Sequence, residues 1–218
     1  ATIRGDHRKD DERTEFRKQA FALQAAKDWA RLVIQSSEWT QAHRNDVLGW
    51  YFLGTAQRNS GENDAALRAF TQGVASPCTT GEDIQLKMLM WFGIGLIYEQ
   101  RHDSSRAIDA YEQAHLTLPF DQMFGNLWSL IVDTGYFRRG ERIYSGIVSR
   151  YPTCERGWVD LGSVPVNLRS ATDGVDAFRT ALRINPQNGR AWMGLYLCHK
   201  MLGNQGGLPE AYQTHQKI

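Results

Sequence analysis

The chain has 218 residues, of which 42% are hydrophobic, and its formal net charge at pH 7 is +1. A charge near zero, without a basic run interleaved with aromatic residues, disfavours a nucleic-acid partner. No apolar run reaches the length of a membrane-spanning helix, and the charged start does not look like a signal peptide. We therefore expect no membrane insertion, and the cytoplasm is favoured over the periplasm. Ala1 at the start is compatible with loss of a Met, with a cleaved signal or with excision from a longer protein.

The beginning of the chain predicts a polar lead-in followed by one helix pair. Residues 1–11 are charged and are expected to form a loose lead-in. Apolar residues between Glu12 and about Ala26 have helical spacing, and Asp28 can cap a second helix. This pair, residues 12–46, lacks the small and terminating residues that mark the later pairs.

Residues 47–80 predict the next pair. Gly61 marks the turn between its helices, and Asn63 or Asp64 can cap the second helix. The pair closes near Pro77 and is followed by an insert.

The insert covers residues 81–87. Thr80 and Asp83 have the spacing of a capping box, with Asp in place of the usual Glu. We expect the insert to lengthen the following helix backwards by almost two turns.

Residues 88–121 carry the clearest pattern. Gly95 leaves room for a neighbouring helix, Pro119 cannot continue the second helix, and good caps for that helix are Asp103, Ser104 and Ser105. With Met88 as position 1, the marked positions are 4, 7, 8, 11, 20, 24, 27 and 32, which hold Trp91, Ile94, Gly95, Tyr98, Ala107, Tyr111, Ala114 and Pro119.

The same register continues through residues 121–154, 155–188 and 189–218, and Trp158 and Trp192 are 34 residues apart. In the first of these units Trp128 replaces the small residue at position 8 and Gly140 replaces the Ala at position 20, which suggests compensated packing.

Two prolines lie at helix positions in these units. Pro165 falls inside a first helix and predicts a kink or early termination at residues 161–166. The last unit should begin its second helix near Pro209.

This combination of positions resembles the tetratricopeptide repeat. The resemblance covers about residues 47–216 and implies an all-α, right-handed superhelical solenoid of antiparallel helix pairs. It gives about five 34-residue repeats after a degenerate first pair, in a single domain over residues 12–218. The expected repeat core comprises Trp50, Gly54, Trp91, Gly95, Tyr98, Ala107, Tyr111, Pro119, Trp158, Gly162, Phe178 and Trp192.

No arrangement of residues predicts catalysis, a metal or a cofactor. The six histidines are dispersed, and Cys78, Cys154 and Cys198 form neither a disulfide framework nor a zinc motif, so we expect free thiols. Gly162-Ser163 lacks the closing Gly of a nucleophile elbow. The Gly-rich segment 203–207 lacks the Lys-Ser/Thr of a phosphate-binding loop. We therefore predict no catalytic residue, no metal ligand and no cofactor.

The resemblance implies a concave groove lined by positions 2, 5, 9, 12 and 13 of the first helices. Some members of the family clamp a carboxylate with Lys at position 5 and Asn at position 9, and those residue types are absent here. The groove instead starts apolar and becomes polar, which suits an amphipathic helix or an extended peptide. The candidate peptide-binding residues are Tyr51, Thr55, Arg58, Phe92, Leu96, Glu99, Ser129, Arg156 and Asn167. Alternatively, the N-terminal helices or a second copy of the chain cover this face.

Two functional hypotheses remain open. The first is a non-catalytic scaffold that binds a peptide or helix of another protein, with a homo-oligomer possible. The second is the repeat portion of a larger enzyme or of a secretion or assembly machine, with the chemistry elsewhere. The full open reading frame discriminates between them.

Overall fold

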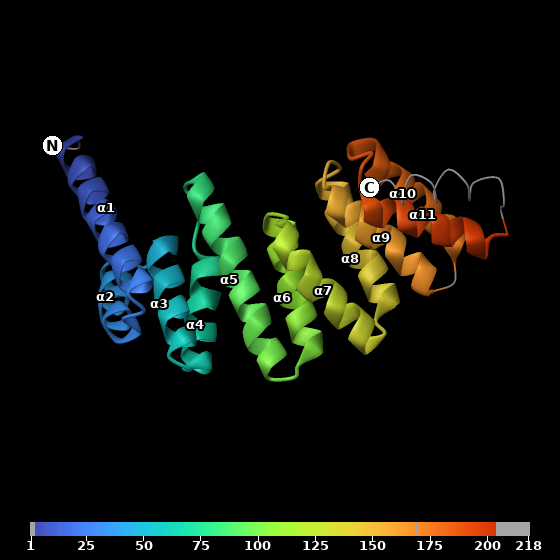
Figure 1. Cartoon of the computed structure of the whole chain (residues 1–218). Helices are drawn as coiled ribbons and strands as arrows, with labels where there is room; N and C mark the ends of the chain where they lie inside the picture. Colours follow the sequence, from blue (N-terminus) through green and yellow to red (C-terminus); the bar gives the residue numbers. More distant parts are fainter. Residues whose placement is uncertain (1–2, 169, 204–218) are drawn as a thin grey trace. The chain divides into compact units, whose positions relative to one another are not determined.

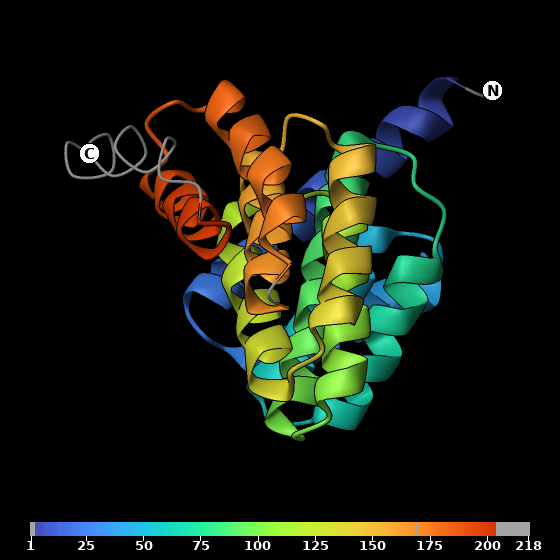
Figure 2. The same cartoon turned by 90° about the vertical axis from the view of Figure 1, so that its right-hand side faces the viewer.

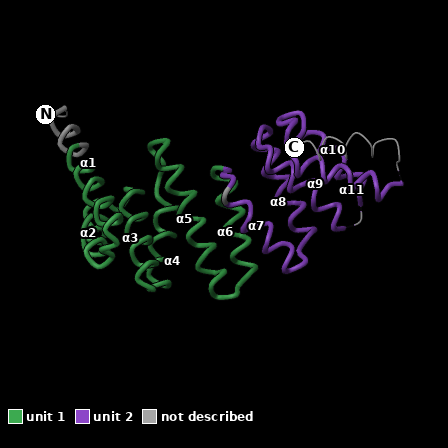
Figure 3. The backbone as a smooth tube through the Cα atoms, in the orientation of Figure 1, with its two compact units in different colours: residues 1–118 green, residues 119–218 purple. Residues whose placement is uncertain are grey.

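The computed structural model describes residues 3–168 and 170–203, and every regular element within them is an α-helix (Figure 1). The chain divides into two compact units, Ala1–Leu118 and Pro119–Ile218 (Figure 3). Unit 1 contains α1 (Ile3–Ala25), α2 (Trp29–Ala42), α3 (Val47–Asn59), α4 (Asn63–Ala75), α5 (Gly81–Gln100) and α6 (Ser104–Thr117). Unit 2 contains α7 (Asp121–Thr134), α8 (Phe137–Arg150), α9 (Glu155–Asn167), α10 (Ala171–Ile184) and α11 (Gly189–Met201).

Within each unit, consecutive helices pack as pairs and each pair packs on the next. This arrangement confirms the expected all-α solenoid of helix pairs. None of the helices in the described ranges combines the length and the apolar character that a membrane-spanning segment needs.

Several helices begin where the sequence predicts a cap. The Asp28 carboxylate accepts from the backbone N–H of Arg31 at the start of α2, and the Asp103 carboxylate accepts from that of Arg106 in α6. Each of these bonds satisfies an N–H group that the first helical turn leaves without a partner.

The start of α4 differs from the prediction. Glu62 is the N-cap and makes no side-chain capping bond, whereas Asn63 and Asp64 are the first two residues of the helix. Gly61 adopts the left-handed conformation, with φ at +82°. This conformation reverses the chain directly before Glu62, so that α4 begins at Asn63 and the prediction of a cap at Asn63 or Asp64 is wrong.

The insert forms a continuous part of α5, as expected. Thr80 and Asp83 make the reciprocal bonds of a capping box, and α5 runs for 20 residues from Gly81. In Figure 1 the α5 ribbon extends beyond α6, and Figure 2 shows the extended connection between the end of α4 and the start of α5.

Helix α1 begins at Ile3 instead of at Glu12, so most of the expected lead-in is helical. A charged segment without Pro, and with a single Gly at position 5, retains enough helix propensity to extend a helix whose later turns are packed. The expectation of a loose lead-in over residues 3–11 is therefore wrong.

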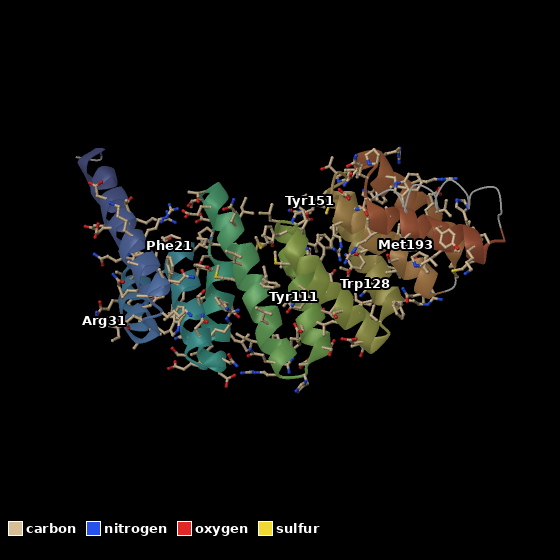
Figure 4. The ribbon with its side chains drawn as sticks, viewed as in Figure 1. Phe21, Arg31, Tyr111, Trp128, Tyr151 and Met193 are labelled. Carbon is tan, nitrogen blue, oxygen red and sulfur yellow. The ribbon has the colours of Figure 1, made fainter. Side chains whose placement is uncertain are left out.

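A glycine facing an aromatic ring sets the helix crossing in three pairs. A Cβ atom on Gly54 would meet the ring of Phe70, and one on Gly95 would meet the ring of Tyr111, which Figure 4 labels. Gly162 faces Phe178 in the same way, with the nearest ring atoms 3.0 Å from an added Cβ. Each of these pairs consists of the residues at repeat positions 8 and 24. The two positions of the assigned repeat register are therefore in contact in all three helix pairs.

The α7–α8 pair packs differently at this crossing. Trp128 is half-buried, and its ring centroid lies 6.4 Å from that of Tyr144. An added Cβ on Gly140 would lie 3.0 Å from side-chain atoms of Ile131. Gly140 at position 20 therefore makes room for Ile131. The replacement of Ala by Gly there does not compensate for the large Trp128 at position 8.

Helix α9 continues through Pro165 to Asn167, so the expected early termination at residues 161–166 is wrong, whereas the alternative, a kink there, stays a prediction. Pro165 lies in the last turn of α9, where it removes its own backbone hydrogen bond to the Leu161 carbonyl, but only two helical residues follow it. Side chains also donate to carbonyls of this end, from Ser163 to Val159 and from Asn167 to Ser163, each over 2.8 Å. The second helix expected near Pro209 lies outside the described residues.

The tryptophans at position 4 serve the core and also tie each helix to the preceding loop. The indole N–H groups of Trp50, Trp158 and Trp192 each donate over 2.8 Å to a backbone carbonyl six residues earlier in the chain. The sequence register predicted their place in the core, but it did not predict these bonds.

Candidate peptide-binding groove

The nine candidate groove residues are divided between the two units. Six lie in unit 1: Tyr51, Thr55 and Arg58 on α3, and Phe92, Leu96 and Glu99 on α5. Three lie in unit 2: Ser129 on α7, and Arg156 and Asn167 on α9.

A hollow of about 600 Å³ lies between the C-terminal ends of α3 and α5. It is lined by Arg58, Asn59, Leu96, Glu99 and Gln100. The structure thus brings three candidate residues together in one concave site, with one cation, one carboxylate and one apolar side chain.

The two charged groups of this hollow differ in whether they already have a partner within the described residues. The Tyr111 hydroxyl donates to Oε2 of Glu99 over 2.6 Å, so the carboxylate already has a partner within unit 1. No acidic side chain of the described residues forms an ion pair with Arg58, which is half-buried. The hollow therefore offers a cation to a ligand more readily than an anion.

Apolar side chains continue along the same side of α5. Leu89 is 39% exposed, and Leu96 lies two turns later at the hollow. Between them, the Phe92 ring is half-buried, with its centroid 5.4 Å from that of Tyr111. On α3, Tyr51 is also half-buried, whereas Thr55 is buried and contributes little open surface.

Phe21 of α1 is an exposed apolar residue that the candidate groove residues did not include. Its side chain, labelled in Figure 4, is 47% exposed, and its ring lies edge-on to that of Phe52 on α3 with the centroids 5.1 Å apart. The degenerate first pair has no position-8 glycine to fix its register, so the sequence carried no signal for this contact.

An ionic cluster joins α1 to the N-terminal ends of α3 and α5. Nε of Arg13 lies 3.2 Å from Oδ1 of Asp46, and its two terminal nitrogens lie 3.5 Å from Glu82 and 3.6 Å from Asp83. Arg17 adds an ion pair with Glu82 at 3.1 Å. The insert thus supplies two carboxylates that hold α1 in place, a role that its capping pattern alone did not reveal.

Asp83 is buried within this cluster, and its carboxylate is well bonded. Oδ2 accepts from the backbone N–H of Thr79 at 2.8 Å, from its hydroxyl at 2.9 Å and from the backbone N–H of Thr80 at 2.9 Å. Burial disfavours the charged form, but these hydrogen bonds outweigh it and hold the pKa of Asp83 below its usual value.

In unit 2, the candidate Arg156 is engaged within its own helix. Its Nε lies 3.0 Å and 3.1 Å from the two carboxylate oxygens of Asp160. Burial raises the pKa of Asp160 to about 6, and the Arg156 charge offsets only part of that effect. Ser129 and Asn167 are exposed, and Asn167 donates to the Ser163 carbonyl.

Helix α11 carries three apolar residues that the candidate set did not include. They lie at four-residue intervals, and each side chain is exposed: Met193, Leu197 and Met201. They occupy positions 5, 9 and 13 of the last unit, so the register that identified the other groove residues also identifies them.

The thiols are free, as expected: Cys78 is exposed, Cys154 is half-buried and Cys198 is buried. Within residues 3–168 and 170–203, no cluster of three or more His, Cys, Asp or Glu side chains has metal-binding geometry.

Comparison with known proteins agrees with this architecture. Residues 51–118 match the family model described as tetratricopeptide repeat. None of the curated proteins matches the sequence. The helix pairs of the described residues fit an array of such repeats.

Solved structures with the same fold are of low sequence identity. The TPR protein YrrB, described as having an unusual peptide-binding site, is 13% identical, with a TM-score of 0.56 over 83% of this chain and 90% of that one. A MamA structure labelled MSR-1 C2 is 13% identical, with a TM-score of 0.51 over 78% and 95%. MamA from Desulfovibrio magneticus RS-1 is 13% identical, with a TM-score of 0.50 over 77% and 92%. At this identity the likeness shows the fold.

Proposed function

We propose that this chain is a protein-binding scaffold whose groove in unit 1 holds an amphipathic helical segment of a partner protein. The observation that carries the proposal is the row of incompletely buried apolar side chains on α5, which ends at the hollow with Arg58. Tetratricopeptide repeat arrays serve as interaction scaffolds, and YrrB is described as having a peptide-binding site. Both points favour a binding role.

The apolar row defines one face of the expected ligand. Leu89, Phe92 and Leu96 lie at i, i+3 and i+7 on α5, so they follow one side of the helix for two turns. A partner helix with apolar residues at the same spacing can cover them along their whole length. Burying one such side chain contributes about 1.5–3 kcal/mol, which corresponds to roughly a tenfold to hundredfold change in affinity.

The charges in the hollow define the direction of the ligand. Arg58 has no acidic partner among the described residues, whereas Tyr111 already bonds Glu99. An acidic residue at the end of the partner helix that reaches this hollow would pair with Arg58. The ligand is therefore expected to combine an apolar face with an acidic end.

A titration with matched variants tests the proposal. A display library of amphipathic helices is selected against the full chain, and a selected peptide is titrated into the parent and into the Phe92→Ala and Leu96→Ala variants. We expect each variant to bind about tenfold more weakly. Ile34→Ala is the control, because Ile34 is 60% exposed on α2, a helix of the same unit that carries none of the candidate groove residues. Equal affinity of both groove variants and the parent would rule out this site.

The direction of the ligand has a separate test. Arg58→Gln should weaken peptides that carry an acid at one end and leave the same peptides unaffected when that acid is replaced by its amide. A loss of affinity for both peptides alike would contradict the assigned role of Arg58.

A further inference from the structure

Helix α8 presents an exposed row of basic residues interrupted by a glycine. Arg138, Arg142, Gly146 and Arg150 follow one another at four-residue intervals, and all four are exposed. The opposite face of α8 is buried in unit 2 through Gly140, Ile143, Tyr144, Ile147 and Val148. We call the exposed row of four the α8 stripe.

The charge of this stripe is largely uncompensated. Helix α8 contains four arginines and one acid, Glu141. Neither Arg138 nor Arg142 forms an ion pair with an acid of the described residues. The Arg150 guanidinium lies over the Tyr151 ring, 5.7 Å from its centroid, and its Nε donates to the Tyr151 hydroxyl over 3.3 Å, so its contact there is with an uncharged side chain. The stripe is therefore a surface of one sign along the length of the helix.

The equivalent positions in the other second helices show that the fold does not require this charge. These positions are 18, 22, 26 and 30 of each repeat, and elsewhere they are neutral, acidic or mixed. They hold Asp64, Arg68, Gln72 and Ser76 on or beside α4; Ser105, Asp109, Gln113 and Thr117 on α6; and Thr172, Asp176, Thr180 and Ile184 on α10. A basic stripe is thus a property of α8 alone among these helices.

Gly146 is also unexplained by the packing of unit 2. A Cβ atom there would meet no neighbouring atom within 4 Å, and its φ lies outside the left-handed region. Glycine in the interior of an exposed helix lowers stability relative to alanine. What its small size does provide is a place where another backbone can approach closely between arginines.

We propose that the α8 stripe binds an acidic α-helix of a partner protein. Four residues advance a helix by about 6 Å, so carboxylates at the same interval on a second helix can face Arg138, Arg142 and Arg150 together. Arginine pairs with carboxylates through two parallel hydrogen bonds, which favours such a match. The two helices approach most closely at Gly146. This surface is independent of the groove in unit 1.

A protein helix fits the stripe better than a nucleic acid does. The stripe offers three cations in a chain whose net charge is only +1, and the stripe itself carries no aromatic residue on which a base can stack. A glycine gap suits the close approach of a second backbone, which phosphate contacts do not need.

The first test uses two synthetic helical peptides of the same composition and the full chain. One has Glu at every fourth position; in the other the same Glu residues are spread around the helix. Fluorescence anisotropy at low and at physiological salt should show about tenfold tighter binding of the regular peptide, which weakens as salt rises. Equal binding of the two peptides would overturn the proposal, because charge without register would then explain the affinity.

Two double variants locate the binding surface. Arg138→Glu with Arg142→Glu should weaken the regular peptide at least about tenfold. Arg179→Glu with Arg183→Glu makes the same change of charge on exposed residues of α10 in the same unit and should leave the affinity nearly unchanged. An equal loss in both double variants would overturn the proposal.

Gly146→Leu tests the close approach. The variant should lose affinity for the regular peptide while its melting temperature stays the same or rises, because a side chain at this position meets no neighbour within unit 2. Retained affinity would show that no backbone packs at Gly146 and would contradict the assigned geometry. Tighter binding of a duplex DNA or single-stranded RNA probe that depends on Arg138 and Arg142 would likewise overturn it in favour of a nucleic-acid surface.

Discussion

Helix pairs α5–α6 of unit 1 and α7–α8 of unit 2 share a repeat register but solve the same packing problem differently. In the first, Gly95 lets the Tyr111 ring lie against the backbone of α5. In the second, Trp128 occupies the corresponding position, and Gly140 makes room for Ile131 instead. A side chain at position 8 is therefore excluded only where the aromatic ring of the second helix lies directly over it.

The two units also bury carboxylates with opposite consequences. Asp83 in unit 1 accepts three hydrogen bonds and has a lowered pKa, whereas Asp160 in unit 2 has a pKa raised to about 6. At Asp83 the hydrogen bonds from Thr79 and Thr80 outweigh the effect of burial on the pKa, whereas at Asp160 burial outweighs the effect of the Arg156 charge and hydrogen bond.

The largest expected effect is on the α5–α6 crossing. Gly95→Leu would place a side chain against the Tyr111 ring, whose Cδ1 is only 2.5 Å from an added Cβ, and should lower the free energy of unfolding by about 3 kcal/mol. Gly125→Leu is the control, because a Cβ on this α7 residue meets nothing within 4 Å. Chemical denaturation of both variants measures the difference, and an unchanged Gly95→Leu protein would refute the packing described here.

The next prediction concerns the pH dependence of stability, which should differ between Asp160 and Asp83. A raised folded-state pKa means that the native state binds the Asp160 proton more tightly than the unfolded chain does. The contribution of Asp160 to stability is thus fully present below its usual value of 3.8 and is lost as the pH rises towards about 6. The free energy of unfolding of Asp160→Asn, relative to that of the parent, should therefore increase by on the order of 2 kcal/mol as the pH rises from 3.8 to about 6. Denaturation at several pH values measures this difference, and a flat profile would contradict it.

Asp83→Asn should show the opposite trend. The pKa of Asp83 is lowered, so its contribution is present above its usual value of 3.8 and is lost as the pH falls below it. The stability difference between the parent and this variant should therefore shrink on acidification. A difference that stays constant down to the acid limit of folding would show that the hydrogen bonds from Thr79 and Thr80 do not favour the ionised form.

The ionic cluster of unit 1 gives a smaller effect. Arg13→Gln would leave Asp83 buried with one cation fewer and should cost about 1–2 kcal/mol, since Arg13 is only 31% exposed. Arg31→Gln removes an ion pair whose arginine is 78% exposed and should cost less than about 1 kcal/mol. Equal losses in the two variants would mean that the cluster holds α1 no better than a surface ion pair does.

The sequence predicted the helix pairs and their core register because those features depend on local residue types. Gly95 with Tyr111, and Asp103 as a cap, follow from spacing within one repeat. The ionic cluster could not be predicted from the sequence, because Arg13 and Asp83 are 70 positions apart and meet only once the helix pairs have stacked. The end of α9 was mispredicted because Pro165 removes only its own backbone hydrogen bond, and α9 continues for two residues beyond it to Asn167.

The candidate groove was predictable only in part, for the same reason. Arg58, Leu96 and Glu99 were named from their positions, and the structure places them around one hollow. Their state depends on neighbours that the register does not specify: Tyr111 bonds Glu99, and Asp160 holds Arg156. Phe21 was missed because α1 has no marked repeat register. Position in a repeat thus identifies which side a residue faces, and its partners decide whether it is available to a ligand.

The smallest effect compares two glycines with opposite surroundings. Gly95→Ala should destabilise the chain, since even one methyl group would overlap the Tyr111 ring. Gly146→Ala should stabilise it by about 0.5–1 kcal/mol, because alanine has the higher helix propensity and the added methyl group meets no neighbour. Thermal melts of the two variants and the parent, under one set of conditions, give the signs directly. If Gly146→Ala were as destabilising as Gly95→Ala, the outer face of α8 would be packed against another part of the protein, and neither the helix-crossing comparison nor the open α8 stripe would stand.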